Sequence, residues 1–232
     1  MHNPLAVEAI SLSKHVTSSE AELTILADLG LAVPHGERVA IVGRSGSGKS
    51  TLLGLLAGLD SPSSGKVLVD NIEISQLDED GRAAIRGQKM GFVFQSFQLL
   101  PSLTALENVM LPLQLAGVDD AKSLAQAALA RVGLESRTSH YPKQLSGGEQ
   151  QRVAIARAFA PKPAILFADE PTGNLDAATG QQIIELLFQL NEEDGTTLIL
   201  VTHDNALADR CQRRLVLTAG KLTEAPVEEA TL

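Results

Sequence analysis

The hydrophobic positions of this chain fall into two patterns, which predict two kinds of β-strand. Three segments, 35–43, 163–169 and 196–203, contain runs of Ile, Leu, Val and Ala without polar alternation. Such runs are typical of strands covered on both faces, so we expect a mostly parallel sheet flanked by helices. The segments 22–33 and 66–74 alternate apolar and polar residues instead. They predict a smaller antiparallel β layer.

Helical spacing of apolar residues marks other parts of the chain. The segment 49–59 reads KSTLLGLLAGL and predicts a helix directly after a glycine-rich loop. Between Phe97 and Gln144 the pattern is again helical, and it includes 121–134, where Gly133 stands near the expected helix end. We therefore expect an α/β fold with a helical subdomain inserted at about 97–160.

The composition is that of an ordinary globular protein. The 232 residues, 44% hydrophobic and 20% charged, suit one large domain with a lobe inserted in it. The longest apolar run, 51–59, is too short to cross a bilayer, and the N-terminus lacks the basic start and apolar centre of a signal peptide. The single cysteine, Cys211, is interpreted as a small core filler in a reducing compartment. These features predict a cytoplasmic location.

The charge distribution argues against a broad nucleic-acid surface. The net charge is −9, and the Lys and Arg residues are scattered. Phosphate backbones are bound by clustered basic residues, so we expect no nucleic-acid partner. The short basic cluster at 210–214 is interpreted as a solvated turn.

A phosphate-binding loop is the strongest motif. The sequence GRSGSGKS at 43–50 matches the P-loop pattern at every fixed position, between a predicted strand and a predicted helix. Lys49 is expected to contact the β- and γ-phosphates, Ser50 to place its hydroxyl on Mg²⁺, and Thr51 to reach the α-phosphate. The other members of the expected cradle are Gly43, Ser45, Gly46, Ser47 and Gly48. The plainer alternative is a glycine turn that only connects a strand to a helix.

Two carboxylates end the apolar run ILFADE at 165–170. Successive strand residues point to opposite faces, so Asp169 and Glu170 should have different tasks. We expect Asp169 to hold Mg²⁺, through water, and Glu170 to act as base or orienting group for the attacking water. The alternative is a pair of acids that cap a strand at a solvent edge.

Two further polar residues follow strand-like runs. His203 comes directly after the segment 196–202, and ligands of open α/β sheets lie at such strand ends. We expect its imidazole to contact the γ-phosphate and steady the catalytic water. Gln95 ends the run FVFQ, and its amide can ligate Mg²⁺ or hold water. The alternative for each is an ordinary surface residue.

A second glycine turn, LSGGEQQR at 145–152, completes a set of motifs. Together with GRSGSGKS, ILFADE, GNLD, Gln95 and His203, it resembles the nucleotide-binding subunits of ABC transporters over nearly the whole chain. The resemblance implies a P-loop NTPase fold with a RecA-like core at about 1–96 and 161–222 and an acidic tail at about 223–232. It also implies that the chain binds ATP and Mg²⁺ and hydrolyses ATP to ADP and phosphate.

The resemblance implies a second copy of the chain as partner. Two such subunits pair head to tail, with ATP between the P-loop of one and the signature turn of the other. Ser146, Gly147 and Gly148 would then approach the γ-phosphate, and Asp176 of GNLD would contact the opposite P-loop region. A local alternative for the turn is a helix cap, with Ser146 at the N-cap and Glu149 three positions on, and both interpretations can hold together.

Within the family, FVFQSFQLLPSLTALENVMLPL and ADEPTGNLD are most similar to the ATPases of lipoprotein release and macrolide export. This implies an integral membrane permease that has a large extracytoplasmic domain. Such a permease would act on a lipid-like or hydrophobic substrate by transmitting motion across the membrane, rather than by conducting the substrate. The subunit would lie peripherally at the cytoplasmic face of the inner membrane. The segment 97–115 would grip a short cytoplasmic helix of the permease, or its leucines would form lobe core.

The alternative is a soluble mechanochemical ABC protein of DNA repair or translation. Such proteins carry a long coiled coil between Gln-loop and signature, or two ATPase halves in one chain. Here about fifty residues without a heptad run separate Gln95 from Leu145, and there is one P-loop.

One position departs from the family pattern. Family members usually carry an aromatic residue near the N-terminus that stacks on adenine, and Val16 stands there, beside His15. Loss of a ring weakens base contact by about 1 kcal/mol. We therefore expect ATP binding with poorer discrimination against GTP than usual, unless His15 stacks instead.

Overall fold

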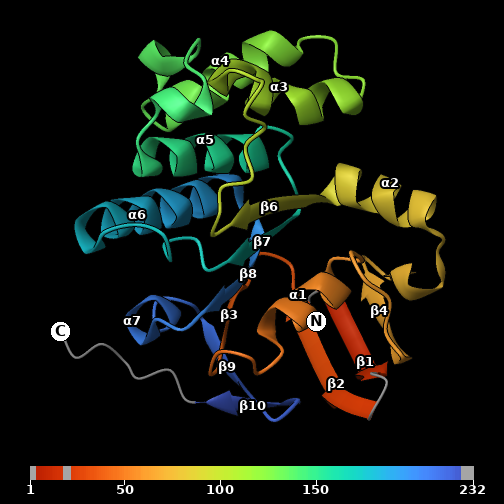
Figure 1. Cartoon of the computed structure of the whole chain (residues 1–232). Helices are drawn as coiled ribbons and strands as arrows, with labels where there is room; N and C mark the ends of the chain where they lie inside the picture. Colours follow the sequence, from red (N-terminus) through yellow and green to blue (C-terminus); the bar gives the residue numbers. More distant parts are fainter. Residues whose placement is uncertain (1–3, 18–21, 226–232) are drawn as a thin grey trace. The chain divides into compact units, whose positions relative to one another are not determined.

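The computed structural model describes residues 4–17 and 22–225 of the chain. Two compact units are present (Figure 1). The first unit comprises Met1–Arg86 with Thr197–Leu232, and the second unit comprises Gly87–Thr196. Within the described residues, no helix is both long and apolar enough to span a bilayer.

The first unit contains an antiparallel sheet with the strand order β2-β1-β4-β5. Its strands are β1 (Leu5–Thr17), β2 (Glu22–Pro34), β4 (Ser64–Val69) and β5 (Ile72–Glu73). The alternating segments therefore form the expected antiparallel layer. The segment 66–74 holds two strands rather than one, because Asp70 and Asn71 adopt positive φ and turn the chain.

The first unit also holds the strands that carry the P-loop. β3 (Arg38–Val42) lies between β8 (Thr197–Thr202) and β9 (Arg213–Thr218) and is parallel to both. All residues of β8 are buried, as the uninterrupted apolar run predicted. β10 (Lys221–Ala225) is antiparallel to β9 and includes the first three residues of the expected acidic tail. The rest of that tail lies outside the described residues.

Short elements connect these strands. α1 (Lys49–Leu56) follows the P-loop, η1 (Ile74–Gln76) follows β5, and α7 (Asn205–Ala208) follows β8. α2 (Glu79–Lys89) was not predicted, and it has no buried residue that could give it an apolar stripe. Its first turn carries Glu79 and Asp80, which suit the positive end of a helix dipole.

The second unit pairs two parallel strands, β6 (Met90–Phe94) and β7 (Ile165–Asp169), with four helices. The helices are α3 (Ala105–Leu115), α4 (Ala121–Arg131), α5 (Gly147–Phe159) and α6 (Ala177–Asp194), with the 3₁₀ turns η2 (Glu135–Arg137) and η3 (Pro142–Gln144). Figure 1 shows α5 between α6 and the pair formed by α3 and α4. Helix α5 is therefore the central helix of this unit.

Candidate nucleotide site

The P-loop in the first unit has the backbone that a phosphate cradle requires. Gly46 and Gly48 have φ values of +77° and +99°, which L-residues with a Cβ rarely adopt. A Cβ on Gly43 would lie 2.5 Å from the main-chain oxygen of Leu217 and 2.7 Å from Oγ of Ser47. The loop therefore passes too close to its surroundings for any larger residue at position 43.

The polar groups of the P-loop fit a phosphate ligand. Nζ of Lys49 donates to the main-chain oxygens of Gly43 and Arg44 at 2.9 and 3.2 Å, and this lysine is only 9% exposed. Oγ of Ser47 is buried and has no hydrogen-bond partner among the described residues. A buried cation and an unsatisfied hydroxyl beside an N-terminal helix turn are suited to an anion. Ser45 and Ser50 are exposed, and Thr51 is half-buried.

Strand register places His203 beside the start of the P-loop. Val42 of β3 is paired with Thr202 of the parallel strand β8. Gly43 and His203 are the next residues, so they leave the carboxyl ends of two neighbouring strands in the same unit. His203 is exposed there. This is the kind of sheet edge at which ligands bind in open α/β folds.

The second unit repeats this arrangement with other residues. Phe94 of β6 is paired with Asp169 of the parallel strand β7. Gln95 and Glu170 therefore follow the ends of adjacent strands, next to Asp169. Glu170 has left the extended conformation, with a φ of +48°. Because the backbone of Glu170 itself is left-handed, the direction of its side chain does not follow the alternation expected from an unbroken strand.

The side chain of Gln95 is held by the loop that follows β7. Nε2 of Gln95 donates to Oδ1 of Asn174 at 3.0 Å, and Nδ2 of Asn174 donates to the main-chain oxygen of Gln95 at 3.0 Å. A Cβ on Gly173 would lie 2.7 Å from Nε2 of Gln95. The predicted motif GNLD thus contacts the predicted Gln95 within one unit.

The signature turn is a capping box at the start of α5. Oγ of Ser146 accepts from the main-chain N–H of Glu149 at 3.2 Å, and the Glu149 carboxylate accepts from the main-chain N–H of Ser146 at 2.8 Å. The cap predicted from the sequence is therefore present. The hydrogen bond from the Ser146 main chain, and then that from Arg137, lower the pKa of Glu149.

The two signature glycines allow α6 and its preceding loop to approach α5. A Cβ on Gly148 would lie 2.6 Å from Cγ2 of Thr179, and one on Gly147 would lie 3.3 Å from Cδ2 of Leu175. Asp176 caps α6, because its Oδ1 accepts from the main-chain N–H of Thr179 at 3.0 Å. This contact of the Thr179 side chain and main chain lowers the pKa of Asp176.

Sequence reasoning missed a partly buried arginine that contacts the Gln95 loop. Arg157 of α5 donates to the main-chain oxygens of Phe97 and Gln98 at 2.9 and 2.6 Å. Both acceptor residues have positive φ, and burial lowers the pKa of Arg157. An arginine within the apolar run VAIARAF was the available signal. Asn174 was missed as well, although it stands inside GNLD.

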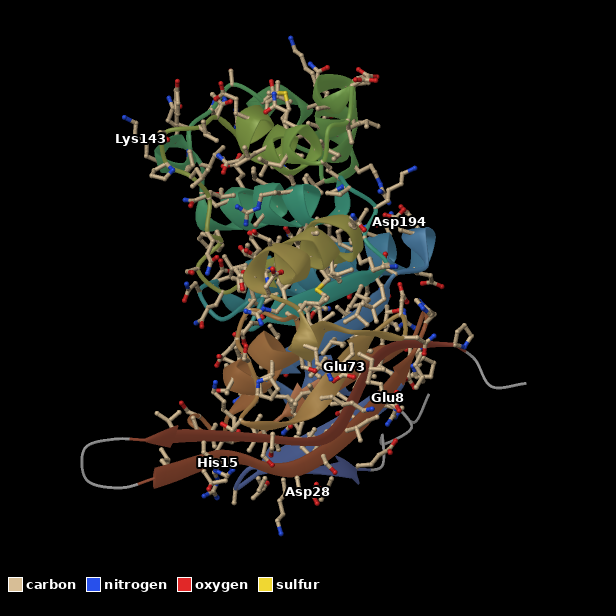
Figure 2. All side chains as sticks on the ribbon, turned by 90° about the vertical axis from the view of Figure 1, so that its right-hand side faces the viewer. Glu8, His15, Asp28, Glu73, Lys143 and Asp194 are labelled. Atoms are coloured by element: carbon tan, nitrogen blue, oxygen red, sulfur yellow. The ribbon has the colours of Figure 1, made fainter. Side chains whose placement is uncertain are left out.

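The candidate base-contacting residues lie on the β1–β2 ribbon of the first unit. Figure 2 shows His15 on this ribbon. Val16 pairs with Leu23 of β2, and the two side chains are 44% and 64% exposed. Nδ1 of His15 lies 3.0 Å from Oγ1 of Thr24. An aliphatic pair therefore stands at the position expected to contact the base, and the histidine ring is engaged with Thr24.

Comparison with known proteins shows matches along the chain. Residues 26–173 match the ABC transporter family. The uncharacterized ABC transporter ATP-binding protein YbbA of Escherichia coli (strain K12) is 56% identical, over 94% of this chain and 96% of its own. The lipoprotein-releasing system ATP-binding protein LolD of Idiomarina loihiensis is 52% identical over 91% and 93% of the two chains. LolD of Legionella pneumophila (strain Paris) is 47% identical over 95% and 98%.

Solved structures agree with these matches. The ATP-binding cassette MJ0796 covers 96% of this chain and 99% of its own, with a TM-score of 0.88 and 43% sequence identity. Its structures are described as dimeric, and one holds a post-hydrolysis state bound to ADP and Pi. The α/β P-loop NTPase fold expected from the motifs is confirmed.

Proposed function

The chain belongs to the family of ABC transporter ATP-binding proteins, and we propose that it drives a membrane permease of the mechanotransmission type. It is the ATP-hydrolysing subunit of a transporter. The proposed permease has a large extracytoplasmic domain and acts on a lipid-like or hydrophobic substrate. The similarity to LolD along nearly the whole chain is the observation that carries this proposal.

The P-loop residues hold the nucleotide in this proposal. Lys49 places its ammonium against the β- and γ-phosphates in place of its present main-chain acceptors, and Thr51 contacts the α-phosphate. Gly43, Ser45, Gly46, Ser47 and Gly48 surround the phosphates. Because the Ser47 hydroxyl is buried and has no partner in the described part of the chain, a phosphate oxygen would satisfy it.

In this proposal the hydroxyl of Ser50, the carboxylate of Asp169 and the amide oxygen of Gln95 would hold Mg²⁺, because these are the oxygen ligands that this cation prefers. When bound, the cation supplies positive charge beside the transferred phosphoryl group. Glu170 orients the attacking water and accepts its proton, and His203 steadies that water by hydrogen bonding.

We propose that a second copy completes the site. Ser146, Gly147 and Gly148 present a hydroxyl proton and the N-terminal N–H groups of α5 to the γ-phosphate bound by the partner. Asp176 contacts the partner near its P-loop. The capping box supports this role, because it fixes the first turn of α5 before any ligand arrives.

We place the permease contact on the second unit. Of the segment predicted to grip a permease helix, Val109 and Leu113 are buried in the unit, whereas Leu100 and Leu115 are 44% and 81% exposed. In this proposal the two exposed leucines contact a short amphipathic helix of the permease. The subunit would then be held peripherally at the cytoplasmic face of the inner membrane.

The test is an affinity purification from detergent-solubilised membranes of the source cells with Mg·ATP, using tagged Glu170→Gln protein. Loss of the proton acceptor should trap the ATP-bound dimer and reduce turnover by at least about a hundredfold. Equal recovery of a polytopic membrane protein with a large extracytoplasmic domain would support the proposal. Glu185→Gln, which neutralises an exposed carboxylate of α6, is the matched control.

Two outcomes would contradict the proposal. Near-normal turnover by Glu170→Gln would show that the assigned role of this residue is wrong. Recovery of soluble partners or nucleic acid, without a membrane protein, would favour the mechanochemical alternative.

A further inference from the structure

The amide groups of Gln95 and Asn174 form a closed pair in the second unit. The glutamine donates through Nε2 to Oδ1 of the asparagine, which donates through Nδ2 to the glutamine main-chain oxygen. The two residues are 79 positions apart and follow β6 and β7 respectively. The pair therefore joins two loops that leave neighbouring parallel strands.

The pair determines the orientation of both amides. A main-chain carbonyl can only accept, so the NH₂ group of Asn174 must face the carbonyl of Gln95. The remaining Oδ1 of Asn174 can also only accept, so the NH₂ group of Gln95 must face it. Oε1 is thus the atom of Gln95 that the pair leaves unused. A carbonyl-type oxygen is a ligand that Mg²⁺ takes, whereas an amide NH₂ is not.

Gly173 provides the space that this orientation needs. A Cβ at this position would lie 2.7 Å from Nε2 and 2.9 Å from Cδ of Gln95. Any larger residue would push the amide away from Asn174. Gly173 and Asn174 thus act on the same side chain, one by size and the other by hydrogen bonding.

We propose that Asn174, with Gly173 as its spacer, is a positioning residue that selects Oε1 of Gln95 as the atom presented to the nucleotide-bound divalent cation. The inference rests on the cation role proposed for Gln95 above. Both side chains are exposed, so without Asn174 the amide of Gln95 would turn freely and present its NH₂ group for part of the time. Residues that orient metal ligands in this way contribute about tenfold or more to metal affinity.

The first test measures Mn²⁺ binding to the full chain by electron paramagnetic resonance, in the presence of the non-hydrolysable analogue AMP-PNP. We expect Asn174→Ala and Gly173→Ala each to raise the Mn²⁺ dissociation constant about tenfold. In a Gln95→Ala background, Asn174→Ala should cause no further change. The matched control is Gln189→Ala, which removes an exposed amide of α6 that donates to Glu193 at 2.8 Å.

The second test needs no ligand. In ¹⁵N-labelled protein, the side-chain NH₂ signals of Gln95 can be assigned by their loss in Gln95→Ala. One proton of the pair should be shifted downfield by its bond to Asn174, and Asn174→Ala should return it to the position of a free glutamine. A signal that Asn174→Ala does not move would overturn the proposed orientation.

The Mn²⁺ titration separates this inference from the proposed function. An unchanged Mn²⁺ affinity in Asn174→Ala, or an equal loss with and without Gln95, would overturn the positioning role while leaving the ATPase assignment intact. A parent protein that binds neither AMP-PNP nor Mn²⁺ would contradict the proposed function, and this inference with it.

Discussion

The carboxylate of Glu149 lies 2.9 Å from Nε of Arg137. Glu149 also closes the capping box with Ser146, in the first turn of α5. A negative charge is favourable at this end of a helix, but it is unfavourable beside an incoming phosphate. The guanidinium of Arg137 offsets that charge, so the turn can keep its carboxylate cap and still accept an anion.

This arrangement predicts that Glu149 contributes to stability in a pH-dependent way. The Ser146 main-chain hydrogen bond and then Arg137 lower the pKa of Glu149 below its ordinary value of 4.5. A lowered pKa means that the carboxylate stabilises the fold above the ordinary pKa, and that this contribution is lost as the pH falls through the lowered pKa. Glu149→Gln keeps an acceptor oxygen and removes the charge.

We expect the parent to unfold at a higher temperature than Glu149→Gln at pH 7, and the difference to close as the pH falls through the lowered pKa of Glu149. Thermal unfolding followed by circular dichroism at a series of pH values measures both midpoints. Other carboxylates titrate equally in the two proteins, so the difference isolates Glu149. A difference that is the same at every pH would contradict this prediction.

Gly43 and Gly54 predict opposite effects of the same substitution. An alanine Cβ at Gly43 would meet the main-chain oxygen of Leu217 at 2.5 Å, and a carbonyl cannot move away without disturbing β9. We expect Gly43→Ala to lower the free energy of unfolding by about 1–3 kcal/mol and to weaken ATP binding. Gly54 lies inside α1, and a Cβ on this residue would have no neighbouring atom within 4 Å outside the helix's own backbone.

Gly54→Ala should therefore raise the free energy of unfolding by about 0.5–1 kcal/mol, because alanine is the better helix residue. Urea denaturation of the two variants measures both changes, and ATP titration should show weaker binding in Gly43→Ala only. Equal stabilities of the two variants would show that the close approach at Gly43 is not rigid.

The buried amide of Asn108 is expected to contribute strongly to stability, so its removal should cause a large loss. This residue of α3 is 1% exposed. It accepts from the main-chain N–H of Leu100 at 2.8 Å and donates to the oxygens of Leu100, Leu103 and Thr104 at 3.0–3.2 Å. Asn108→Ala removes one hydrogen bond from each of these main-chain groups, so we expect a loss of about 2–3 kcal/mol in the free energy of unfolding.

Urea denaturation measures the effect of Asn108→Ala, and Gln114→Ala is its control. Gln114 is an exposed amide near the end of the same helix, and its removal should change stability by less than about 0.5 kcal/mol. Similar losses in both variants would mean that Asn108 does not organise the loop before α3.

Val16 predicts weak discrimination between nucleotide bases. The aliphatic pair of Val16 and Leu23 offers no aromatic face, so we expect GTP to compete with ATP more effectively than in relatives with a ring at this position. Val16→Tyr should increase the preference for ATP by about fivefold or more, on the scale of base stacking energies. Competition binding with a fluorescent ATP analogue measures the ratio.

Strong ATP preference in the parent would contradict this prediction, and His15→Ala would then show whether the histidine ring is responsible. Nδ1 of His15 lies 3.0 Å from Thr24, and Thr24→Val should free the ring without removing it.

The local pattern of the sequence predicted most strands and the N-terminal cap of α5. The apolar runs before Gly43 and before Glu170 became buried parallel strands, because a strand covered on both faces must be apolar throughout. The cap formed by Ser146 and Glu149 was readable because its partners are three residues apart. Helix α2 was not, because it buries no residue and so leaves no apolar stripe.

The sequence by itself identified the family, since the P-loop at 43–50 and the signature turn at 145–152 are contiguous motifs whose backbone geometry is imposed by nearby residues. Only the tertiary structure showed that Gln95 donates to Asn174 and that Arg157 donates to the loop after Gln95. These partners stand about sixty to eighty positions apart in the chain. Polar contacts at such separations do not appear in the periodicity of the sequence, because they depend on how β6, β7 and α5 pack.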